Sequence, residues 1–365
     1  MVSFTTSWGR ATGRLSTLVG ERCRLVSPGF RLASCISRPP NLRHSNYTFS
    51  RAFTVSRRTS DEANKSSAIA RRLKDPEHAG QRARLREFGL DNRVYVVTGG
   101  ARGLGLVLAE ALVEAGGHVY CLDRLTEPDA SFHETQRRLL ASGFDGSLHY
   151  KRVDVQDAKD LDWVISEAAA AHGRMDGLVA AAGVQNVTPA LEYPPEKIAE
   201  MMNINYTGVY LSAVACAKQM IKYKTPGAMC LIGSMSGLVA NKGLITSVYN
   251  SSKAAVMQLG RSLAMEWGQM KEFEGVTDAS VAGSHLGHKR GIRVNVLCPG
   301  NIITPMVQKN FEDEPHLRAL WESGNMMGRI SEPEEYRGAV LFMLSDASSF
   351  MTGSHLVVDG GYTAW

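Results

Sequence analysis

The sequence predicts an open, doubly wound α/β sheet whose strands are mostly parallel, with helices on both faces. Two observations predict it: short β-rich runs alternate with longer stretches of helical periodicity, and a glycine-rich turn joins the first run to the first helix. Repeated units of strand, crossover helix and parallel strand build such a sheet. The apolar fraction of 44% and the charged fraction of 21% are those of an ordinary globular protein.

The elements follow one another in a regular order. Runs with strand composition occupy residues 94–97, 118–122, 147–153, 177–180, 228–232, 293–298 and 355–358. Helical periodicity lies between most of them, for example over 105–115, 197–218 and 251–267. Parallel neighbours need crossover connections of this length. We therefore expect one domain over residues 88–365.

Composition excludes several other classes of protein. The longest apolar runs, near 178–184 and 211–217, are far shorter than the ~18 residues of a membrane-spanning helix, so no membrane span is expected. His285 and His288 have no third ligand nearby, so no metal site is predicted. The cysteines form no C-x-x-C pair, which indicates reduced, mostly buried thiols. They are Cys23, Cys35, Cys121, Cys216, Cys230 and Cys298.

The net charge of +5 is unevenly distributed along the chain. Residues 1–60 hold ten arginines, no lysine and one acid, Glu21, which gives +9 there and leaves −4 on the rest. An arginine-rich, serine-rich and acid-poor N-terminus is typical of a mitochondrial presequence, whereas a nucleic-acid arm normally uses lysine too. We predict a transit peptide over 1–53, a linker over 54–87 and a matrix location. A disordered basic tail and a cytoplasmic location are the alternative.

The first strand runs into a turn of sequence T-G-x-x-x-G-x-G that opens a helix. Glycines allow a sharp turn and a close approach of the backbone to a pyrophosphate, whose charge then lies at the N-terminus of the helix. We therefore expect this turn to bind a dinucleotide. The residues assigned to it are Thr98, Gly99, Arg102, Gly103, Leu104 and Gly105.

An acid follows at the end of the second strand. Asp123 lies twenty residues after Gly103, where a carboxylate accepts hydrogen bonds from the adenosine ribose and repels a 2′-phosphate. This favours NAD(H), although Arg102 and Arg124 leave NADP open, because a guanidinium can pair with a phosphate. Asp154 and Val155, after the third strand, are predicted to contact the adenine ring.

Tyr249 and Lys253 open a helix and stand one turn apart, on one face. A nearby ammonium, together with a cationic nicotinamide, favours the phenolate of a tyrosine whose pKa is ordinarily ~10. This pair follows a strand that ends at Ser234 and Ser236, either of which offers a hydroxyl to polarise a carbonyl. It also follows Asn205 in the preceding helical stretch.

Taken together, these motifs resemble the short-chain dehydrogenase/reductase family, which has a Rossmann fold, over about 88–365. The matching pieces in order are Thr98-Gly99, Gly103, Gly105, Asn205, Ser234, Tyr249, Lys253, Pro299-Gly300-Asn301-Ile302-Ile303-Thr304 and Asp359-Gly360-Gly361.

The resemblance implies a catalytic group of Asn205, Ser234, Tyr249 and Lys253. In it Tyr249 is the general acid/base, and Lys253 lowers its pKa and binds the nicotinamide ribose. Ser234 holds the substrate oxygen, and Asn205 supports a water that links Lys253 to solvent.

The resemblance also implies further contacts to the cofactor. The carboxamide of the nicotinamide would be held by the Ile302 backbone and the Thr304 hydroxyl. The remaining implied cofactor residues are Ala182, Gly183, Pro299 and Gly300, together with Tyr249 and Lys253.

Three features depart from the family pattern. The usual Asn-Asn-Ala-Gly after the fourth strand is Ala180-Ala181-Ala182-Gly183, for which we expect an adjustment of the fold rather than lost chemistry. Ser234 lies 15 positions before Tyr249 where 13 is the commonest spacing, so Ser236 also qualifies as the active serine; we choose Ser234. Residues 271–290 are predicted to be an insertion at the surface.

The motif variants resemble the fungal polyol and sugar branch of the family. This implies an NAD(H)-linked oxidoreductase for a small-molecule alcohol or ketone, such as arabinitol and ribulose or xylulose, working as a homotetramer or homodimer. A mobile substrate lid is expected over 305–331. The alternatives are an NADPH-dependent 3-oxoacyl-thioester reductase of mitochondria and a dinucleotide-binding scaffold without turnover.

Overall fold

The computed structural model describes residues 85–365 apart from 274–290, 305–306, 309–310 and 313–314. These described residues all belong to one compact unit, residues 76–365. The predicted transit peptide, most of the predicted linker, most of the 271–290 insertion and the two histidines in it lie outside the described residues.

The centre of the described unit is a seven-stranded, all-parallel sheet with the strand order β3-β2-β1-β4-β5-β6-β7. Every predicted strand is present, with its ends within one residue of the prediction, which confirms the fold class. The strands are β1 (Val94–Thr98), β2 (His118–Asp123), β3 (Ser147–Arg152), β4 (Gly177–Ala180), β5 (Ala228–Ile232), β6 (Arg293–Pro299) and β7 (His355–Val358).

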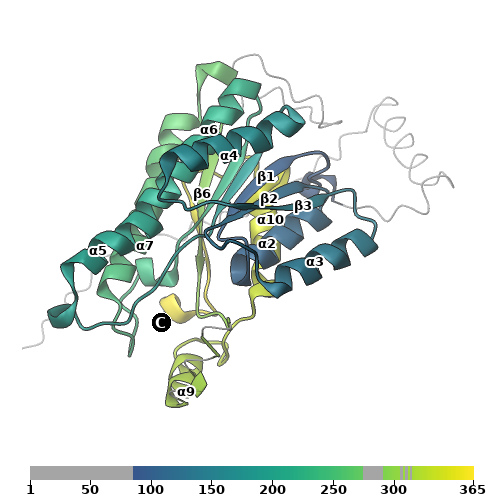
Figure 1. Cartoon of the computed structure of the whole chain (residues 1–365). Helices are drawn as coiled ribbons and strands as arrows, with labels where there is room; N and C mark the ends of the chain where they lie inside the picture. The colour runs from purple at the N-terminus through teal and green to yellow at the C-terminus, as the bar shows by residue number, and fades with distance from the viewer. Residues whose placement is uncertain (1–84, 274–290, 305–306, 309–310, 313–314) are drawn as a thin grey trace, which may run out of the picture. The chain divides into compact units, whose positions relative to one another are not determined.

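Helices cover both faces of the sheet (Figure 1). One face carries α4 (Ala158–His172), α6 (Gly208–Tyr223) and α7 (Ser247–Trp267), which enclose one cluster of buried apolar residues with the strands. The other face carries α2 (Gly103–Glu114), α3 (Ala130–Ala141) and α10 (Arg337–Leu344), around a second cluster. Strands β1, β4 and β5 are buried along their whole length, because helices pack on both sides of them.

The predicted helix 197–218 is present but is not uniform. It consists of α5 (Pro195–Met202), a π-helical segment Asn203–Thr207 and α6. A π turn adds one residue per turn and often occurs at functional sites. Here the fully buried Asn205 lies within it.

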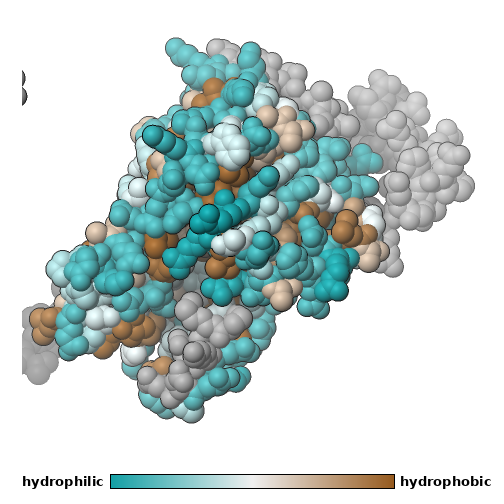
Figure 2. Space-filling model, viewed as in Figure 1, coloured by the Kyte–Doolittle hydropathy of each residue, from teal (hydrophilic) through white to brown (hydrophobic). Residues whose placement is uncertain are grey.

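The strand order reverses between β1 and β4, the two central strands that continue in opposite directions across the sheet. In doubly wound sheets, ligands bind outside the carboxyl ends of the strands at such a point. Helix α9 (His316–Ser323) and the C-terminus lie at one end of the molecule (Figure 1). Figure 2 shows a mostly hydrophilic surface in the same view, with apolar residues gathered toward the end formed by α5.

Candidate active site

The turn after β1 has the conformation that its glycines allow. Gly99 and Gly103 have φ values of 70° and 59°, a region that L side chains rarely adopt. Gly105 lies in the first turn of α2, where a Cβ would stand 2.2 Å from the carbonyl oxygen of Gly99. The helix can therefore approach the turn this closely only with glycine at position 105.

The N-terminus of α2 is suited to an anion. Its N-cap residue, Arg102, is extended and makes no side-chain cap, and the first turn holds no acid. The first N–H groups of a helix have no partner within the helix, so they are available to a phosphate. A Cβ added at Gly103 would meet no atom within 4 Å, which shows open space in front of the turn. These residues fit a dinucleotide pyrophosphate.

Asp123 ends β2 beside this turn. Its carboxylate accepts the backbone N–H of Ala101 at 3.3 Å and that of Leu125 at 3.4 Å. These long hydrogen bonds hold the side chain at the turn and leave it acceptor capacity for a ribose. Arg102 and Arg124 are both exposed on the same edge.

Asp154 and Val155 have different surroundings after β3. Asp154 is exposed and accepts the backbone N–H of Gln156 at 3.0 Å, so it closes a local turn. Val155 is buried, and a Cβ at Gly208 would approach its Cγ2 to 2.6 Å. The predicted adenine contact therefore falls on a residue that also packs against the start of α6.

Thr98 and the alanines after β4 join the two central strands. The buried Thr98 accepts the N–H of Ala182 at its hydroxyl, 3.3 Å away, and the N–H of Ala181 at its carbonyl, 3.2 Å away. Thr98 therefore holds residues 181 and 182, which follow β4, against the end of β1. This pairing also shows how the segment is held without the asparagine that the family pattern has there.

Tyr249 and Lys253 meet on one face of α7, as their spacing predicts. The ammonium nitrogen of Lys253 lies 5.7 Å from the centre of the Tyr249 ring and donates to the carbonyl of Ile232 at 2.9 Å. A Cβ added at Gly183 would lie 3.6 Å from this nitrogen. Gly183 is exposed and adjoins the ammonium, an arrangement that fits the ribose of a nicotinamide.

Burial dominates the ionisation of this pair. It lowers the pKa of Lys253 to about 8 and raises the pKa of the Tyr249 phenol, which a hydrogen bond with the Ser234 side chain opposes. Burial thus disfavours the charged form of both groups in the protein alone, and for the phenol this is the reverse of what the spacing predicts. The expected lowering of its pKa therefore depends on the positive charge that an oxidised nicotinamide brings.

Asn205 connects the π turn to this pair. Its carboxamide oxygen accepts the N–H of Val184 at 2.8 Å, and its amide nitrogen donates to the Val184 carbonyl at 2.9 Å and to the Ser252 hydroxyl at 3.0 Å. Ser252 in turn donates to the carbonyl of Tyr249 at 2.7 Å. Our sequence reasoning missed Ser252, although it stands inside the Tyr-x-x-x-Lys motif.

Two further groups complete the buried side of the site. The hydroxyl of Ser234 accepts the N–H of Ser236 at 3.1 Å and hydrogen-bonds to the Tyr249 phenol, which favours Ser234 as the active serine. Cys298, also missed, lies beside Ser234: burial raises the pKa of its thiol to about 11, and the backbone N–H of Ser234 opposes this shift.

The segment after β6 turns away from the sheet. A Cβ at Gly300 would lie 2.7 Å from the Cα of Asp359, so the chain passes β7 closely. Ile302 forms a parallel bridge with Ser331, and the Thr304 hydroxyl accepts the N–H of Val307 at 3.3 Å. This places the predicted carboxamide contacts at the base of the predicted lid, part of which lies outside the described residues.

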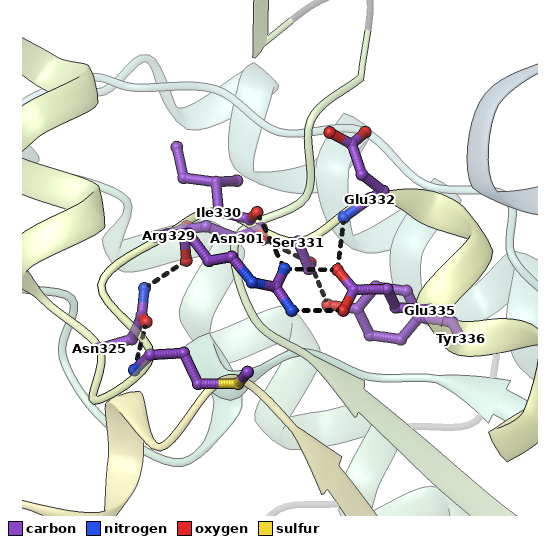
Figure 3. A network of polar contacts seen from close by, with 9 residues as sticks. Asn301, Asn325, Arg329, Ile330, Ser331, Glu332, Glu335 and Tyr336 are labelled. Atoms are coloured by element: carbon purple, nitrogen blue, oxygen red, sulfur yellow. Dashed lines mark hydrogen bonds and ion pairs between the residues drawn. The ribbon is translucent and has the colours of Figure 1, made fainter.

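A hydrogen-bonded network surrounds a hollow beside this segment (Figure 3). The guanidinium of Arg329 binds both carboxylate oxygens of Glu335, at 2.6 and 2.7 Å, which lowers the pKa of Glu335 to about 2. Ser331 donates to the carbonyl of Asn301 at 2.7 Å, and Asn325 donates to the carbonyl of Arg329 at 2.8 Å. The network joins residues 325–336 to Asn301, which follows β6 by two residues.

Neither a metal cluster nor a spanning helix is found in the part of the chain that the structure describes. That part has no group of three or more His, Cys, Asp or Glu side chains able to hold a metal ion. None of its helices is long and apolar enough to cross a membrane.

Comparison with protein families agrees with this geometry. The family model described as short chain dehydrogenase matches residues 93–315. A second model, described as Enoyl-(Acyl carrier protein) reductase, matches residues 279–363.

Curated proteins and solved structures are similar over about three quarters of the chain. "Short chain dehydrogenases/reductase notP'" of Aspergillus versicolor is 40% identical, covering 76% of this chain and 89% of its own. A ribulose-forming D-arabinitol 2-dehydrogenase of Candida albicans (strain WO-1) is 33% identical, covering 76% and 95%. The crystal structure of a gluconate 5-dehydrogenase from Burkholderia cenocepacia J2315, in complex with NADP and tartrate, has a TM-score of 0.64 and 29% identity, covering 77% and 99%.

Proposed function

The chain belongs to the short-chain dehydrogenase/reductase family and is an NAD(P)-dependent oxidoreductase acting on alcohols or ketones; within that class, we propose that its substrates are a polyol and the corresponding ketose. The observation that carries the proposal is the cluster of Ser234, Tyr249 and Lys253 beside the exposed Gly183. The similarity to an arabinitol dehydrogenase supports the substrate class.

Each residue of the cluster has a separate role in the proposed oxidation of an alcohol. A nicotinamide dinucleotide, when bound, accepts the hydride from the carbinol carbon. Tyr249 takes the hydroxyl proton in the same reaction, so a secondary alcohol becomes a ketone, and in reduction Tyr249 returns the proton. Ser234 donates to the substrate oxygen. The Lys253 ammonium stabilises the phenolate and holds the ribose.

The cofactor that we propose is NAD(H). The Asp123 carboxylate, held at the turn by two backbone N–H groups, would repel the 2′-phosphate of NADP. Arg102 and Arg124 on the same edge, and a solved relative that holds NADP, favour the other cofactor. The fixed position of the carboxylate decides our choice.

The runner-up function is a 3-oxoacyl-thioester reductase that uses NADPH. It is favoured by the second family model, whose description names a reductase of acyl-carrier-protein substrates.

Assembly and location complete the proposal. We infer a homotetramer or homodimer formed through α5, α6 and α7, with β7 at a second interface. Large apolar side chains stand exposed on or near these elements, as a buried interface requires: Ile198, Met265 and Phe350. We also infer import into the mitochondrial matrix with removal of residues 1–53. Import of the full chain into isolated mitochondria, followed by sizing of the product, tests that inference.

The test of function is a panel of pentitols, hexitols and ketoses, with a 3-oxoacyl thioester alongside, each assayed with NAD(H) and NADP(H). We expect turnover of a polyol with NAD. In Tyr249→Phe, kcat should fall by about 10²- to 10⁴-fold, because the general acid/base is lost. The matched control is Tyr210→Phe, an exposed position on α6, which should retain activity. Turnover of the thioester with NADPH alone would instead support the runner-up.

A further inference from the structure

A second hollow is lined by segments that adjoin the cluster in the chain, among them Asn301 after β6. Besides Asn301, three segments that are distant in sequence form its walls: the loop 241–244, helix α9 with Gly324 after it, and Tyr362 near the C-terminus. The loop is connected to the catalytic helix, because Asn250, the neighbour of Tyr249, donates from its side-chain amide to the Asn241 side chain at 3.2 Å.

Glycines allow these three segments to pack closely. A Cβ at Gly243 would lie 2.6 Å from a methyl group of Leu320 on α9. A Cβ at Gly324, just after α9, would lie 2.9 Å from the Tyr362 ring, and one at Gly361 would lie 2.8 Å from Met326. Real Cβ atoms do not approach other atoms below 3.0 Å. The loop, the helix and residues 360–365 are therefore in direct contact.

Hydrogen bonds from residues 360–365 reach both other walls. The Tyr362 hydroxyl accepts the backbone N–H of Lys242 at 2.8 Å, and the indole N–H of Trp365 donates to the carbonyl of Gly324 at 3.0 Å. Asp359 holds the segment itself, since its carboxylate accepts the N–H groups of Gly361 and Thr363, each at 2.9 Å. One short segment thus connects the loop to the helix.

The lining of this hollow matches a polyhydroxylated chain. Amide and hydroxyl groups of Asn241, Asn301 and Ser323 stand beside the rings of Trp321 and Tyr362, with no acid among the lining residues. Such groups can hydrogen-bond to the hydroxyls of a polyol while the rings cover its C–H faces.

We propose that residues 360–365 position the outer wall of the substrate pocket, and that Tyr362 and Trp365 thereby determine specificity for polyols of five or six carbons. The inference rests on the proposed function. The carbons next to the reacting hydroxyl contact the catalytic cluster, whereas only a longer chain extends to the wall that these residues hold. A four-carbon polyol should therefore be insensitive to them.

The test uses Tyr362→Phe and Trp365→Phe in the full chain, with Tyr210→Phe as control. Each variant removes one hydrogen bond and keeps an aromatic ring, so KM for pentitols and hexitols should rise by about 3- to 10-fold, the effect of one hydrogen bond. For erythritol and threitol, kcat and KM should change by less than about twofold. An equal rise in KM for every chain length, or no rise at all, would overturn the assignment of specificity.

Hydrogen exchange of the protein without substrate separates this inference from the proposed function. The backbone N–H of Lys242 should exchange faster in Tyr362→Phe, and peptides that cover α9 should exchange faster in Trp365→Phe, with both unchanged in Tyr210→Phe. Unchanged exchange in the first two variants would show that residues 360–365 do not hold the wall. If the native protein oxidises no polyol, the proposed function fails, and exchange still decides whether the wall is positioned in this way.

Discussion

The two walls that we propose for the active site are held in different ways: the inner wall comprises the Ser234, Tyr249 and Lys253 cluster with Asn205, together with the turn 98–105 and Asp123, and the outer wall is the one that residues 360–365 hold. On the inner wall, Asn205, Ser234 and Lys253 are less than a tenth exposed, and most of their hydrogen-bond partners are backbone groups. The outer wall depends on single hydrogen bonds from Tyr362 and from Trp365, whose side chain is 80% exposed.

This difference separates chemistry from specificity. The inner wall cannot move without disturbing the core, so the reacting groups keep one geometry for any substrate. A wall held by a few hydrogen bonds at the surface can change without loss of the fold, since each bond contributes only about 1 kcal/mol. We therefore expect substitutions to act very differently on the two sides.

The largest effect should come from Gly105→Ala, which changes the inner wall at the turn predicted to bind the cofactor. The new Cβ would stand 2.2 Å from the Gly99 carbonyl oxygen, so the turn must shift. We expect a loss of cofactor affinity of about 100-fold or more, because the N–H groups of α2 leave the phosphate. Calorimetric titration with NAD measures it. In the control, Gly338→Ala on α10, the added Cβ meets open space, and affinity should be unchanged.

Lys253→Met tests whether the buried ammonium, which the proposed reaction needs, lowers the stability of the protein. Burial lowers the pKa of Lys253 from 10.5 to about 8, which corresponds to a cost of about 3 kcal/mol for the buried ammonium. The Ile232 carbonyl loses its partner at a cost of about 1 kcal/mol. At pH 7 the free energy of unfolding of the variant should therefore be about 2 kcal/mol higher than that of the native protein, while the activity of the variant is lost.

The pH dependence of that gain has a definite sign. Because the pKa is lower in the folded state, the cost of the ammonium is complete below pH 8 and disappears as the pH rises toward 10.5. Denaturant unfolding of both proteins at pH 7 and pH 10 measures the difference. Lys218→Met, an exposed position on α6, is the control and should change stability little. Destabilisation by Lys253→Met at pH 7 would contradict this account.

A smaller effect is expected at the edge of the inner wall, where Asp123→Asn removes a negative charge. The ratio of kcat/KM with NADP to that with NAD should rise by about tenfold, the effect of 1.4 kcal/mol, because the repulsion of the 2′-phosphate is lost. Asp162→Asn, which removes an exposed carboxylate from α4, should leave the ratio unchanged. An unchanged ratio in Asp123→Asn would show that Arg102 and Arg124 decide the preference.

The smallest effect on the active site is expected from substitutions in a group of histidines around β2 and β3, away from both walls. His118 stacks on His172, and the Ser147 hydroxyl bridges His118 and His149 at 2.8 Å each. Burial lowers the pKa of His149 and of His172, and the neighbouring histidines, Lys151 and Arg174 lower them further.

Because these pKa values are lowered in the folded state, the stability that the neutral rings contribute is present above pH 6.5 and is lost as the pH falls below it. Urea unfolding between pH 7.5 and 5.5 should show this loss, and His149→Gln should reduce it. Cofactor affinity measured at pH 7.5 should be the same in His149→Gln and the native protein. A change in affinity there would mean that this edge of the sheet is coupled to the active site.

The family, the sheet and the clustering of the catalytic residues followed from the sequence. Short β-rich runs between helical stretches predict a parallel sheet because alternation is a local property, and the Tyr249–Lys253 spacing places both side chains on one helical face. The order of a strand, a glycine-rich stretch and a helix along the chain also predicted the strand-to-helix turn at Gly99–Gly105. These are features within one element or between neighbours in the sequence.

Only the tertiary structure reveals the contacts between residues that lie far apart in the sequence. The hydrogen bonds of Ser252, the place of Cys298 beside Ser234, and the contact of Tyr362 with Lys242 depend on how separate elements pack. The ionisation of Tyr249 and Lys253 belongs here as well. Spacing predicts the attraction between the two groups, but only burial, which no local pattern reveals, determines which protonation state is favoured.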